Sequence, residues 1–313
     1  IYTFRFDQQT GSGSALDSVE LPNPSYLTVS ENCKFVYAVS EMNDNTAALN
    51  ALAFNPESGS LRLVSKQLTR GADPCHVVAN DRIVLTANYS GGSLSVFPLN
   101  ANGTTAPADT LFHGQATGPD KLRQITPHIH CAVFSPDGDY VFATDFSADR
   151  ILRFAVTSKG LSAKSEDTAI PVKSDSGPRH LTFAPDGKHA YAIGELSGEI
   201  TAFAYADGNL TTLQTIAADT TGARGSADIH VSPDGKFLYA SNRLKNDGIA
   251  IFAIHPQEGT LTPIGYQRTG IHPRNFNITP NGKYLLVACR DSNVIQVVER
   301  NLQSGKLKDT HQD

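Results

Sequence analysis

The chain has 313 residues and a mass of 33.5 kDa, and its 40% hydrophobic and 18% charged residues exclude a disordered polymer. A formal net charge of −5 and a pI of about 6.1 argue against nucleic acid or an anionic membrane as a partner. No apolar stretch approaches the ~18 residues that a membrane-spanning helix needs.

Two short strands are predicted at the N-terminus. Ile1–Phe6 has the alternating apolar pattern of Ile249–Ile254 further along the chain, and Leu16–Leu21 follows as a second extended run. Ile249–Ile254 is the third strand of a four-stranded repeat. The N-terminal pair therefore matches the outer half of one repeat, and we expect the two inner strands of that repeat to lie outside this sequence.

Six complete copies of the repeat follow. They open at Pro24, Pro74, Pro127, Pro178, Ser226 and Pro273. The last four copies carry a turn triplet between their first two apolar runs: Pro136-Asp137-Gly138, Pro185-Asp186-Gly187, Pro233-Asp234-Gly235 and Pro280-Asn281-Gly282. Proline presets φ and glycine accepts positive φ, so each triplet predicts a hairpin. A third and a fourth run complete each copy, which makes four short strands over ~50 residues.

Four-stranded sheets repeated at this period indicate a β-propeller. Six copies and one half copy predict an all-β, seven-bladed β-propeller of four-stranded antiparallel blades. We expect residues 1–313 to form a single β-propeller domain, with the ring closed by strands from both termini. The chain contains no tryptophan, so the Trp-Asp mark of WD repeats is missing.

Polar side chains recur at one rim of this predicted propeller. The first strand of every blade lines the central channel, so equivalent positions in the copies form a ring. The first strands contribute His76, His130, Arg179, His180, Asp228, Arg274 and Asn275, and the ends of the second strands contribute Glu195, Arg243 and Arg290. Shielded polar groups are costly unless they are paired, so this rim is a candidate ligand site. Alternatively, the arginines and the glutamate pair with one another and plug the channel.

Three blocks of sequence resemble a known family. They are Gly177-Pro178-Arg179-His180-Leu181-Thr182-Phe183 followed by Glu195-Leu196, Ala227-Asp228-Ile229-His230-Val231-Ser232-Pro233-Asp234-Gly235, and Pro273-Arg274-Asn275-Phe276. At this spacing they resemble the seven-bladed β-propeller lactonase family. That family includes the propeller-type 6-phosphogluconolactonase and the fungal 3-carboxy-cis,cis-muconate lactonizing enzyme.

The resemblance implies a catalytic group of one histidine, two arginines and one glutamate. By motif it falls on His130, Arg179, Arg274 and Glu195. An arginine would stabilise the oxyanion, and the histidine would take a proton from water, with the glutamate as an alternative base or as a group that orients an arginine. We expect substrate-binding roles for the other rim residues, His76, His180, Asp228, Arg243, Asn275 and Arg290. Cationic side chains fill the electrophile's role, so no metal and no cofactor are expected.

The implied activity is hydrolysis of a small anionic lactone. The substrate would be 6-phospho-D-glucono-1,5-lactone, which opens to 6-phosphogluconate in the pentose phosphate pathway. One alternative is a carboxymuconate cycloisomerase, in which the arginines would hold carboxylates. Another is a non-catalytic propeller that binds a ligand or a protein. Fold alone does not decide among the three.

The cysteines bear on the compartment. Cys33, Cys75, Cys131 and Cys289 are far apart and form no Cys-x-x-Cys pair, which agrees with a reducing compartment. We therefore expect a cytoplasmic protein. The first residue is Ile1 rather than Met, so we also expect part of the native N-terminus to precede this sequence, which leaves a periplasmic or secreted protein open.

Overall fold

The structure is a computed structural model that describes residues 1–115, 117–158, 160–162 and 169–312. Two compact units make up the chain. Unit 1 contains Ile1–Arg5 and Gly13–Ser174, and unit 2 contains Phe6–Ser12 and Asp175–Asp313. Regular structure in the described residues is β-strand, apart from the 3-10 helix η2 (Arg290–Ser292). No helix in that part of the chain has the length and apolar character needed to cross a membrane.

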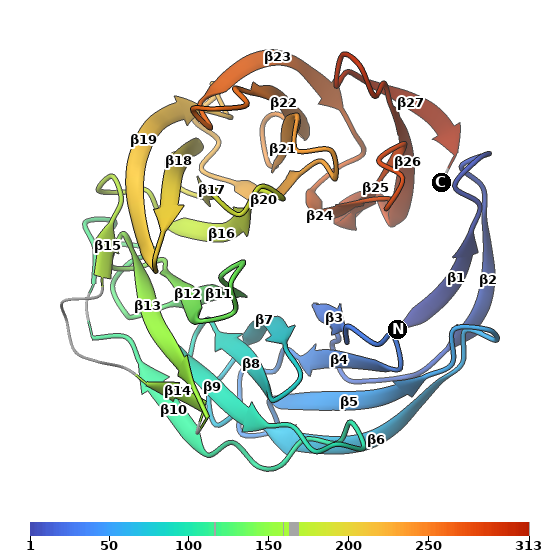
Figure 1. The fold of residues 1–313 in the computed structure, drawn as a ribbon, viewed down its shortest axis with the longest axis vertical. Coiled ribbons are helices and arrows are strands. Elements are labelled where there is room, and N and C mark those ends of the chain that lie inside the picture. Colours follow the sequence, from blue (N-terminus) through green and yellow to red (C-terminus); the bar gives the residue numbers. More distant parts are fainter. Residues whose placement is uncertain (116, 159, 163–168, 313) are drawn as a thin grey trace. The chain divides into compact units, whose positions relative to one another are not determined.

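Unit 1 contains three antiparallel sheets in which each strand pairs with the next along the chain (Figure 1). The first sheet is β3 (Leu27–Val29), β4 (Phe35–Ser40), β5 (Ala48–Phe54) and β6 (Leu61–Leu68). The second is β7 (Pro74–Ala79), β8 (Ile83–Asn88), β9 (Ser93–Pro98) and β10 (Thr110–His113). The third is β11 (Ile129–Phe134), β12 (Tyr140–Asp145), β13 (Arg150–Thr157) and β14 (Gly160–Ser162), with β15 (Ala169–Pro171) also paired to β13.

Unit 2 contains three further sheets of the same order (Figure 1). They are β16 (Pro178–Phe183), β17 (His189–Gly194), β18 (Glu199–Ala206) and β19 (Asn209–Ala217); β20 (Ser226–Val231), β21 (Phe237–Asn242), β22 (Gly248–Ile254) and β23 (Leu261–Arg268); and β24 (Pro273–Ile278), β25 (Tyr284–Cys289), β26 (Val294–Arg300) and β27 (Leu307–Gln312). The first strands β16, β20 and β24 contact one another in sequence.

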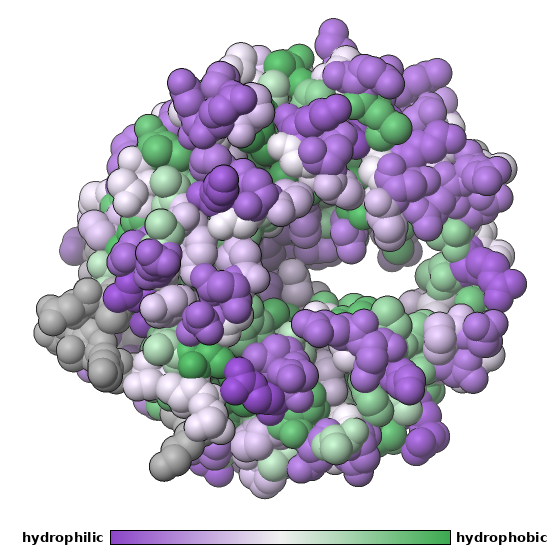
Figure 2. Space-filling model, viewed as in Figure 1, coloured by the Kyte–Doolittle hydropathy of each residue, from purple (hydrophilic) through white to green (hydrophobic). Residues whose placement is uncertain are grey.

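Apolar side chains between neighbouring sheets form the cores of both units. In unit 2, Tyr191 and Leu238 lie in one such cluster and Tyr239 and Phe276 in the next, and all four are buried. Sheets of four antiparallel strands that pack face to face in chain order are the blades of a β-propeller. Hydrophilic side chains cover much of the face of the molecule shown in Figure 2, with hydrophobic ones in smaller groups between them.

The predicted turn triplets form the hairpins between first and second strands. Gly138, Gly187, Gly235 and Gly282 adopt positive φ of 66 to 77°. In the fifth copy, which opens at Ser226, the Ser232 hydroxyl donates to Asp234 Oδ1 at 2.6 Å, which closes the turn with side-chain atoms. The repeat reading of the sequence is therefore correct for these copies.

The blade count differs from the prediction of seven. The described residues form six sheets of four or five strands and one two-stranded sheet, β1 (Tyr2–Phe6) with β2 (Gly13–Ser18). The second strand of that pair begins earlier than the predicted Leu16–Leu21, because the turn ends by Ser12, whose carbonyl accepts from the Asp7 amide. The all-β propeller of four-stranded antiparallel blades is correct, and the single domain over residues 1–313 stays a prediction.

Candidate functional site

A β-bulge lies in the first strand of five blades, at the positions that the repeat alignment singles out. The strand register shifts between Pro74 and His76, Ile129 and Cys131, Pro178 and His180, Ser226 and Ile229, and Pro273 and Asn275. The residues in the bulges include His130, Arg179 and Arg274. A bulge re-aims a side chain and interrupts the ladder, which is why such bulges accompany functional sites.

Two arginines of unit 2 converge on one carboxylate. Arg179, from β16, donates from Nε to Glu195 Oε2 at 2.9 Å. Arg243, from the end of β21, brings Nη2 to 3.2 Å from the same oxygen. Glu195 follows β17, and its backbone amide donates to Gly177 O at 2.9 Å, which fixes the end of that strand beside the start of β16. All three side chains are buried.

A third arginine adds to the positive charge. Burial and the positive charges of Arg179 and Arg274 lower the pKa of Arg243 to about 9, although Glu195 opposes that shift. Arg274 is half-buried in β24, the first strand of the sheet after next from β16. Arg179 and Arg243 therefore share one carboxylate, which can neutralise only one of them, and the charge of Arg274 acts on Arg243. Such a cluster is suited to binding an anion.

Asp228 lies at the centre of a buried hydrogen-bond network. Its Oδ1 pairs with His180 Nδ1 at 2.7 Å, and its Oδ2 accepts from Asn275 Nδ2 at 2.6 Å and pairs with His230 Nε2 at 3.0 Å. Burial alone would raise the pKa of Asp228, but the charge of His230 and the hydrogen bonds from His230 and His180 hold it well below its usual value. The carboxylate is thus ionised.

His180 is a neutral member of this network. Arg179 Nη1 lies 3.1 Å from His180 Nε2, and a guanidinium can only donate, so Nε2 accepts and the proton is on Nδ1. Burial and the charge of Arg179 lower the pKa of His180 to about 4. In contrast, the Asp228 carboxylate overcomes the effect of burial and raises the pKa of His230.

His272 is a site residue that the sequence analysis did not identify. It immediately precedes Pro273, one position before the aligned first strand, and the repeat alignment therefore passed it over. Its Nε2 lies 3.2 Å from Arg243 Nη1, and its Nδ1 lies 3.4 Å from Asp291 Oδ2. Burial and the charges of Arg243 and Arg290 lower the pKa of His272 to about 4. Its backbone adopts a positive φ of 61°, which the sequence pattern did not predict for a histidine.

Arg290 is more exposed than expected for a residue in the middle of a site. It lies in η2, and its Nε donates to Asp291 Oδ1 at 2.6 Å. Its Nη2 is 3.2 Å from His272 Nδ1, which connects it to the arginine cluster through a histidine.

His130 and His76 belong to unit 1. His130 is buried in β11, where Cys75 Sγ lies 3.8 Å from its Nδ1 and the ring of Tyr89 meets it edge to face at 5.5 Å. His76 is buried in β7 and packs against the ring of Tyr26 at 4.3 Å. Arg179, His180, Glu195, Asp228, Arg243, Arg274, Asn275 and Arg290 all belong to unit 2.

An aromatic cluster surrounds His130 within unit 1. Tyr89 stacks on His128 with ring centroids 4.1 Å apart and an interplanar angle of 3°. Arg123 lies 5.3 Å from the centroid of the Phe146 ring and donates to the Tyr89 hydroxyl at 3.3 Å. Flat aromatic faces with a cation beside them can pack against a sugar ring and an anionic group.

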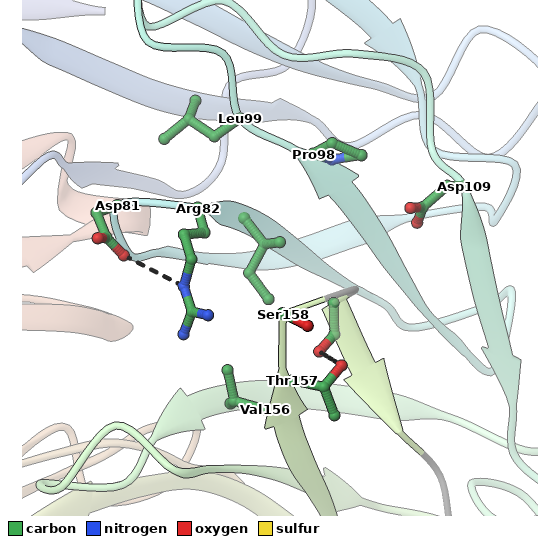
Figure 3. A pocket seen from close by; sticks show the side chains of 10 residues that line it. Asp81, Arg82, Pro98, Leu99, Asp109, Val156, Thr157 and Ser158 are labelled. Carbon is green, nitrogen blue, oxygen red and sulfur yellow. Dashed lines mark hydrogen bonds and ion pairs between the residues drawn. The ribbon is translucent and has the colours of Figure 1, made fainter.

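A separate pocket lies at strand ends of unit 1 (Figure 3). It has a volume of about 330 Å³ and is lined by residues that include Asp81, Arg82, Asp109, Val156 and Thr157. Figure 3 shows the Arg82 side chain pairing with its neighbour Asp81, at 3.7 Å. None of the ten predicted site residues lines this pocket. In the described ranges, no group of three or more His, Cys, Asp or Glu side chains could hold a metal ion.

Comparison with known proteins places this site in context. A family model described as "Lactonase, 7-bladed beta-propeller" matches residues 1–313. A protein named 6-phosphogluconolactonase from Formosa agariphila is 39% identical over 324 residues, which cover 100% of this chain and 92% of that protein. A 6-phosphogluconolactonase from Bacillus subtilis is 32% identical over 318 residues, covering 98% of this chain and 89% of the relative.

Solved structures agree with the sequence relatives. A crystal structure titled "putative 6-phosphogluconolactonase" from Bacteroides uniformis superposes with a TM-score of 0.97 at 67% identity, covering 100% of this chain and 91% of that one. The structure of a periplasmic gluconolactonase from Pseudomonas aeruginosa superposes with a TM-score of 0.92 at 32% identity, covering 99% and 90% of the two chains.

Proposed function

Because the chain belongs to the seven-bladed β-propeller lactonase family, we propose that it hydrolyses 6-phospho-D-glucono-1,5-lactone to 6-phosphogluconate. The observation that carries the choice of substrate is the pair of arginines, Arg179 and Arg243, that share the carboxylate of Glu195, with the charge of Arg274 acting on Arg243. A phosphate group carries about −1.5 to −2 charges near pH 7, which matches the excess of guanidinium charge.

In the proposed reaction, water attacks the lactone carbonyl and the ring ester opens. Charge builds on the carbonyl oxygen in the tetrahedral intermediate, and Arg179 or Arg274 stabilises it. His130 accepts the proton from the attacking water, because an imidazole titrates near neutral pH, and returns it to the ring oxygen as the carbon–oxygen ester bond breaks. Glu195 orients Arg179 and Arg243, with which it is already paired. Arginines fill the electrophile's role in this scheme, so it calls for no metal ion.

We also propose that β1 and β2 are the outer half of a seventh blade. Within unit 1, the hydroxyl of Thr3 in β1 donates to Gly59 O at 2.8 Å. Within unit 2, the hydroxyl of Tyr284 donates to Gln9 O at 3.0 Å, and its ring meets Phe6 edge to face at 5.7 Å. The cytoplasmic location stays a prediction.

The test is a direct assay with two substrates. Purified protein is mixed with fresh 6-phosphogluconolactone and coupled to 6-phosphogluconate dehydrogenase, and 3-carboxymuconate and its lactone are tested in parallel. We expect lactone hydrolysis that survives EDTA and falls at least 100-fold in Arg179→Ala and in His130→Ala. Turnover of 3-carboxymuconate instead would assign the cycloisomerase activity, and no turnover of either would favour a binding protein.

A further inference from the structure

Two chains of hydrogen bonds and ion pairs, with the same order of residue types, meet at Glu195. In the first, Asp228 pairs with His180, His180 Nε2 lies 3.1 Å from Arg179 Nη1, and Arg179 pairs with Glu195. In the second, the order is Asp291, His272, Arg243 and Glu195. Each chain thus runs from an aspartate through a histidine and an arginine to the same carboxylate oxygen, Oε2.

The groups on either side of a histidine decide which ring nitrogen carries the proton. A guanidinium is always a donor, so His180 Nε2 must accept from Arg179. The single proton of the neutral His180 imidazole is then on Nδ1, where Asp228 accepts it at 2.7 Å. His272 Nδ1 lies 3.2 Å from Arg290 Nη2 and 3.4 Å from Asp291 Oδ2, so the donor rule fixes the tautomer of His180 alone. Asp228 therefore selects the tautomer of His180, as the buried aspartate does in a Ser-His-Asp triad.

From this geometry we propose that His180 and His272 are positioning residues, which hold the Arg179 and Arg243 guanidinium groups toward Glu195 and the bound anion without neutralising them. This inference rests on the proposed function, because it treats the guanidinium groups as ligands of the substrate's anion. A carboxylate in place of either histidine would also orient the arginine, but it would cancel the charge that the anion needs.

The hydrogen bonds of His180 support a positioning role over substrate contact for the first chain. Its Nε2 faces Arg179 Nη1 at 3.1 Å and its Nδ1 pairs with Asp228 Oδ1 at 2.7 Å, so both ring nitrogens are engaged by protein groups. The expectation that they bind substrate directly is therefore replaced by one in which they act through Arg179. The Asp228 carboxylate also pairs with His230 and accepts hydrogen bonds from Asn275 and the Phe276 amide. These contacts hold the carboxylate in place beside His180.

Hydrogen bonds support the same role for the second chain. His272 adopts a positive φ of 61°, which is uncommon for a residue with a side chain. Its backbone amide donates to Asp247 Oδ1 at 2.8 Å, which holds it in that conformation. Arg243 is fixed from its other side, where Nε donates to Gly225 O at 2.7 Å. Asn23, Asp73 and Gly177, which precede the opening prolines of other blades, also have positive φ, so this conformation belongs to the repeat. The hydrogen bonds of His272 and Arg243 are what hold these two residues in place.

The experiment separates the effect of the hydrogen bond that each histidine accepts from the effect of the space that its side chain fills. In His180→Gln and His272→Gln, an amide oxygen can replace Nε2 as a neutral acceptor, whereas His180→Leu and His272→Leu fill the space but accept nothing. We measure the Kd of inorganic phosphate by calorimetry, KM and kcat for 6-phosphogluconolactone, and the unfolding midpoint. The leucine variants should weaken phosphate binding about tenfold or more, and the glutamine variants should stay within about threefold of wild type.

A matched control is available in the same unit. His189 Nδ1 pairs with Asp186 Oδ2 at 2.7 Å, at the opposite end of β17 from Glu195. Asp186→Asn breaks an aspartate–histidine pair of the same length without touching either arginine, and it should leave phosphate affinity unchanged. Asp291→Asn is a gentler test of the second chain, because that aspartate is partly exposed and its loss does not threaten folding. It should weaken phosphate binding several-fold.

The outcomes distinguish this inference from the proposed function. Equal phosphate affinity in the wild type and in both leucine variants would overturn the positioning role, even if lactone hydrolysis is found. The role would also be overturned if Asp186→Asn weakened phosphate binding as much as Asp291→Asn. Phosphate affinities that follow the expected order in a protein that does not hydrolyse the lactone would support the positioning role and overturn the proposed function.

Discussion

Anion binding should depend on the planar shape of the Arg274 guanidinium as well as on its charge. Lysine at this position keeps the charge but loses the planar fork that matches a phosphate or carboxylate. We expect Arg274→Lys to weaken phosphate binding and turnover by about tenfold, and Arg274→Ala and Arg179→Ala to lower turnover by roughly 100-fold or more. Calorimetry with inorganic phosphate and steady-state kinetics measure the two effects. Equal phosphate affinity in wild type, Arg179→Ala and Arg274→Ala would leave both arginines as channel plugs.

His180 should make the folded protein sensitive to acid. Its pKa is about 4 in the folded state, against 6.5 in its unperturbed form, so between those pH values the unfolded chain binds a proton that the folded chain does not. The free energy of unfolding therefore falls as the pH drops through that window, by roughly 3 kcal/mol from this group. The groups around the imidazole are Arg179, Asp228 and His230, and the raised pKa of His230 acts in the opposite direction.

Urea unfolding at pH 7.5 and pH 4.5 isolates this contribution. His180→Gln removes the titrating group but keeps a neutral acceptor for Arg179, so its stability should fall less than that of the wild type between the two pH values. The difference should be about 2 kcal/mol or more. If both proteins lose the same free energy, the imidazole titrates normally in the folded state, and its assignment as a buried neutral acceptor is wrong.

Repeat positions predicted that Arg179 and Glu195 lie near each other, but they did not predict which histidines contact the arginines. Arg179 and Glu195 could be placed near each other because equivalent positions in successive blades come to one rim. His272 could not, because its position before Pro273 is set by a left-handed backbone that only structure reveals. The sequence also could not show that His180 faces Asp228 rather than a ligand, since that choice depends on side-chain packing between β16 and β20.

The Pro-Asp-Gly turns are the elements that the sequence predicted most securely. Gly235 has a φ of 70°, and a Cβ added there would have no heavy atom within 4 Å, so substitution costs conformational strain alone. We expect Gly235→Ala to lower the free energy of unfolding by about 1 kcal/mol, and Gly235→Asn to lower it less, because asparagine tolerates the left-handed region. Chemical denaturation of the purified variants measures both values.

Gly13 provides the matched control for that substitution. It is exposed, starts β2, lacks a positive φ, and a Cβ there would reach only Arg5 O at 4.0 Å. Alanine at this position should be neutral or slightly stabilising, because it reduces the entropy of the unfolded chain. A loss at Gly13 equal to that at Gly235 would mean that backbone conformation is not the cause.

Contacts between hairpins were beyond the reach of pattern analysis. Arg300 in β26 donates from Nη2 to Asp234 in the turn of the preceding blade at 2.7 Å, and its Nε donates to the Tyr239 hydroxyl at 2.9 Å. The turn triplet predicted a hairpin at Asp234 but gave no sign that its carboxylate would be an ion-pair partner. Such contacts depend on how two neighbouring sheets pack, which alternation of apolar residues within one strand does not encode.

At the scale of the whole molecule, the overall charge and the charge of the candidate site have opposite signs. The protein carries a formal net charge of −5, yet Arg179 and Arg243 share one carboxylate and the charge of Arg274 acts on Arg243. Total charge repels an anionic substrate weakly over long distances, whereas a local cationic cluster attracts it at close range. The local attraction governs binding only if the substrate itself carries a charge that the cluster can pair with.

Salt therefore provides a test of the substrate's chemical class. Raising the ionic strength from about 0.05 M to about 0.5 M shortens the Debye length to a few ångström and screens the approach of a charged substrate. We expect KM for 6-phosphogluconolactone to rise several-fold, mostly without a change in kcat, because the loss is in association. Uncharged glucono-1,5-lactone, if it is turned over, should show a KM that changes by less than about twofold over the same range. An equal salt dependence for both lactones would mean that the phosphate does not meet the arginine cluster, and would assign the guanidinium groups to the lactone carbonyl alone.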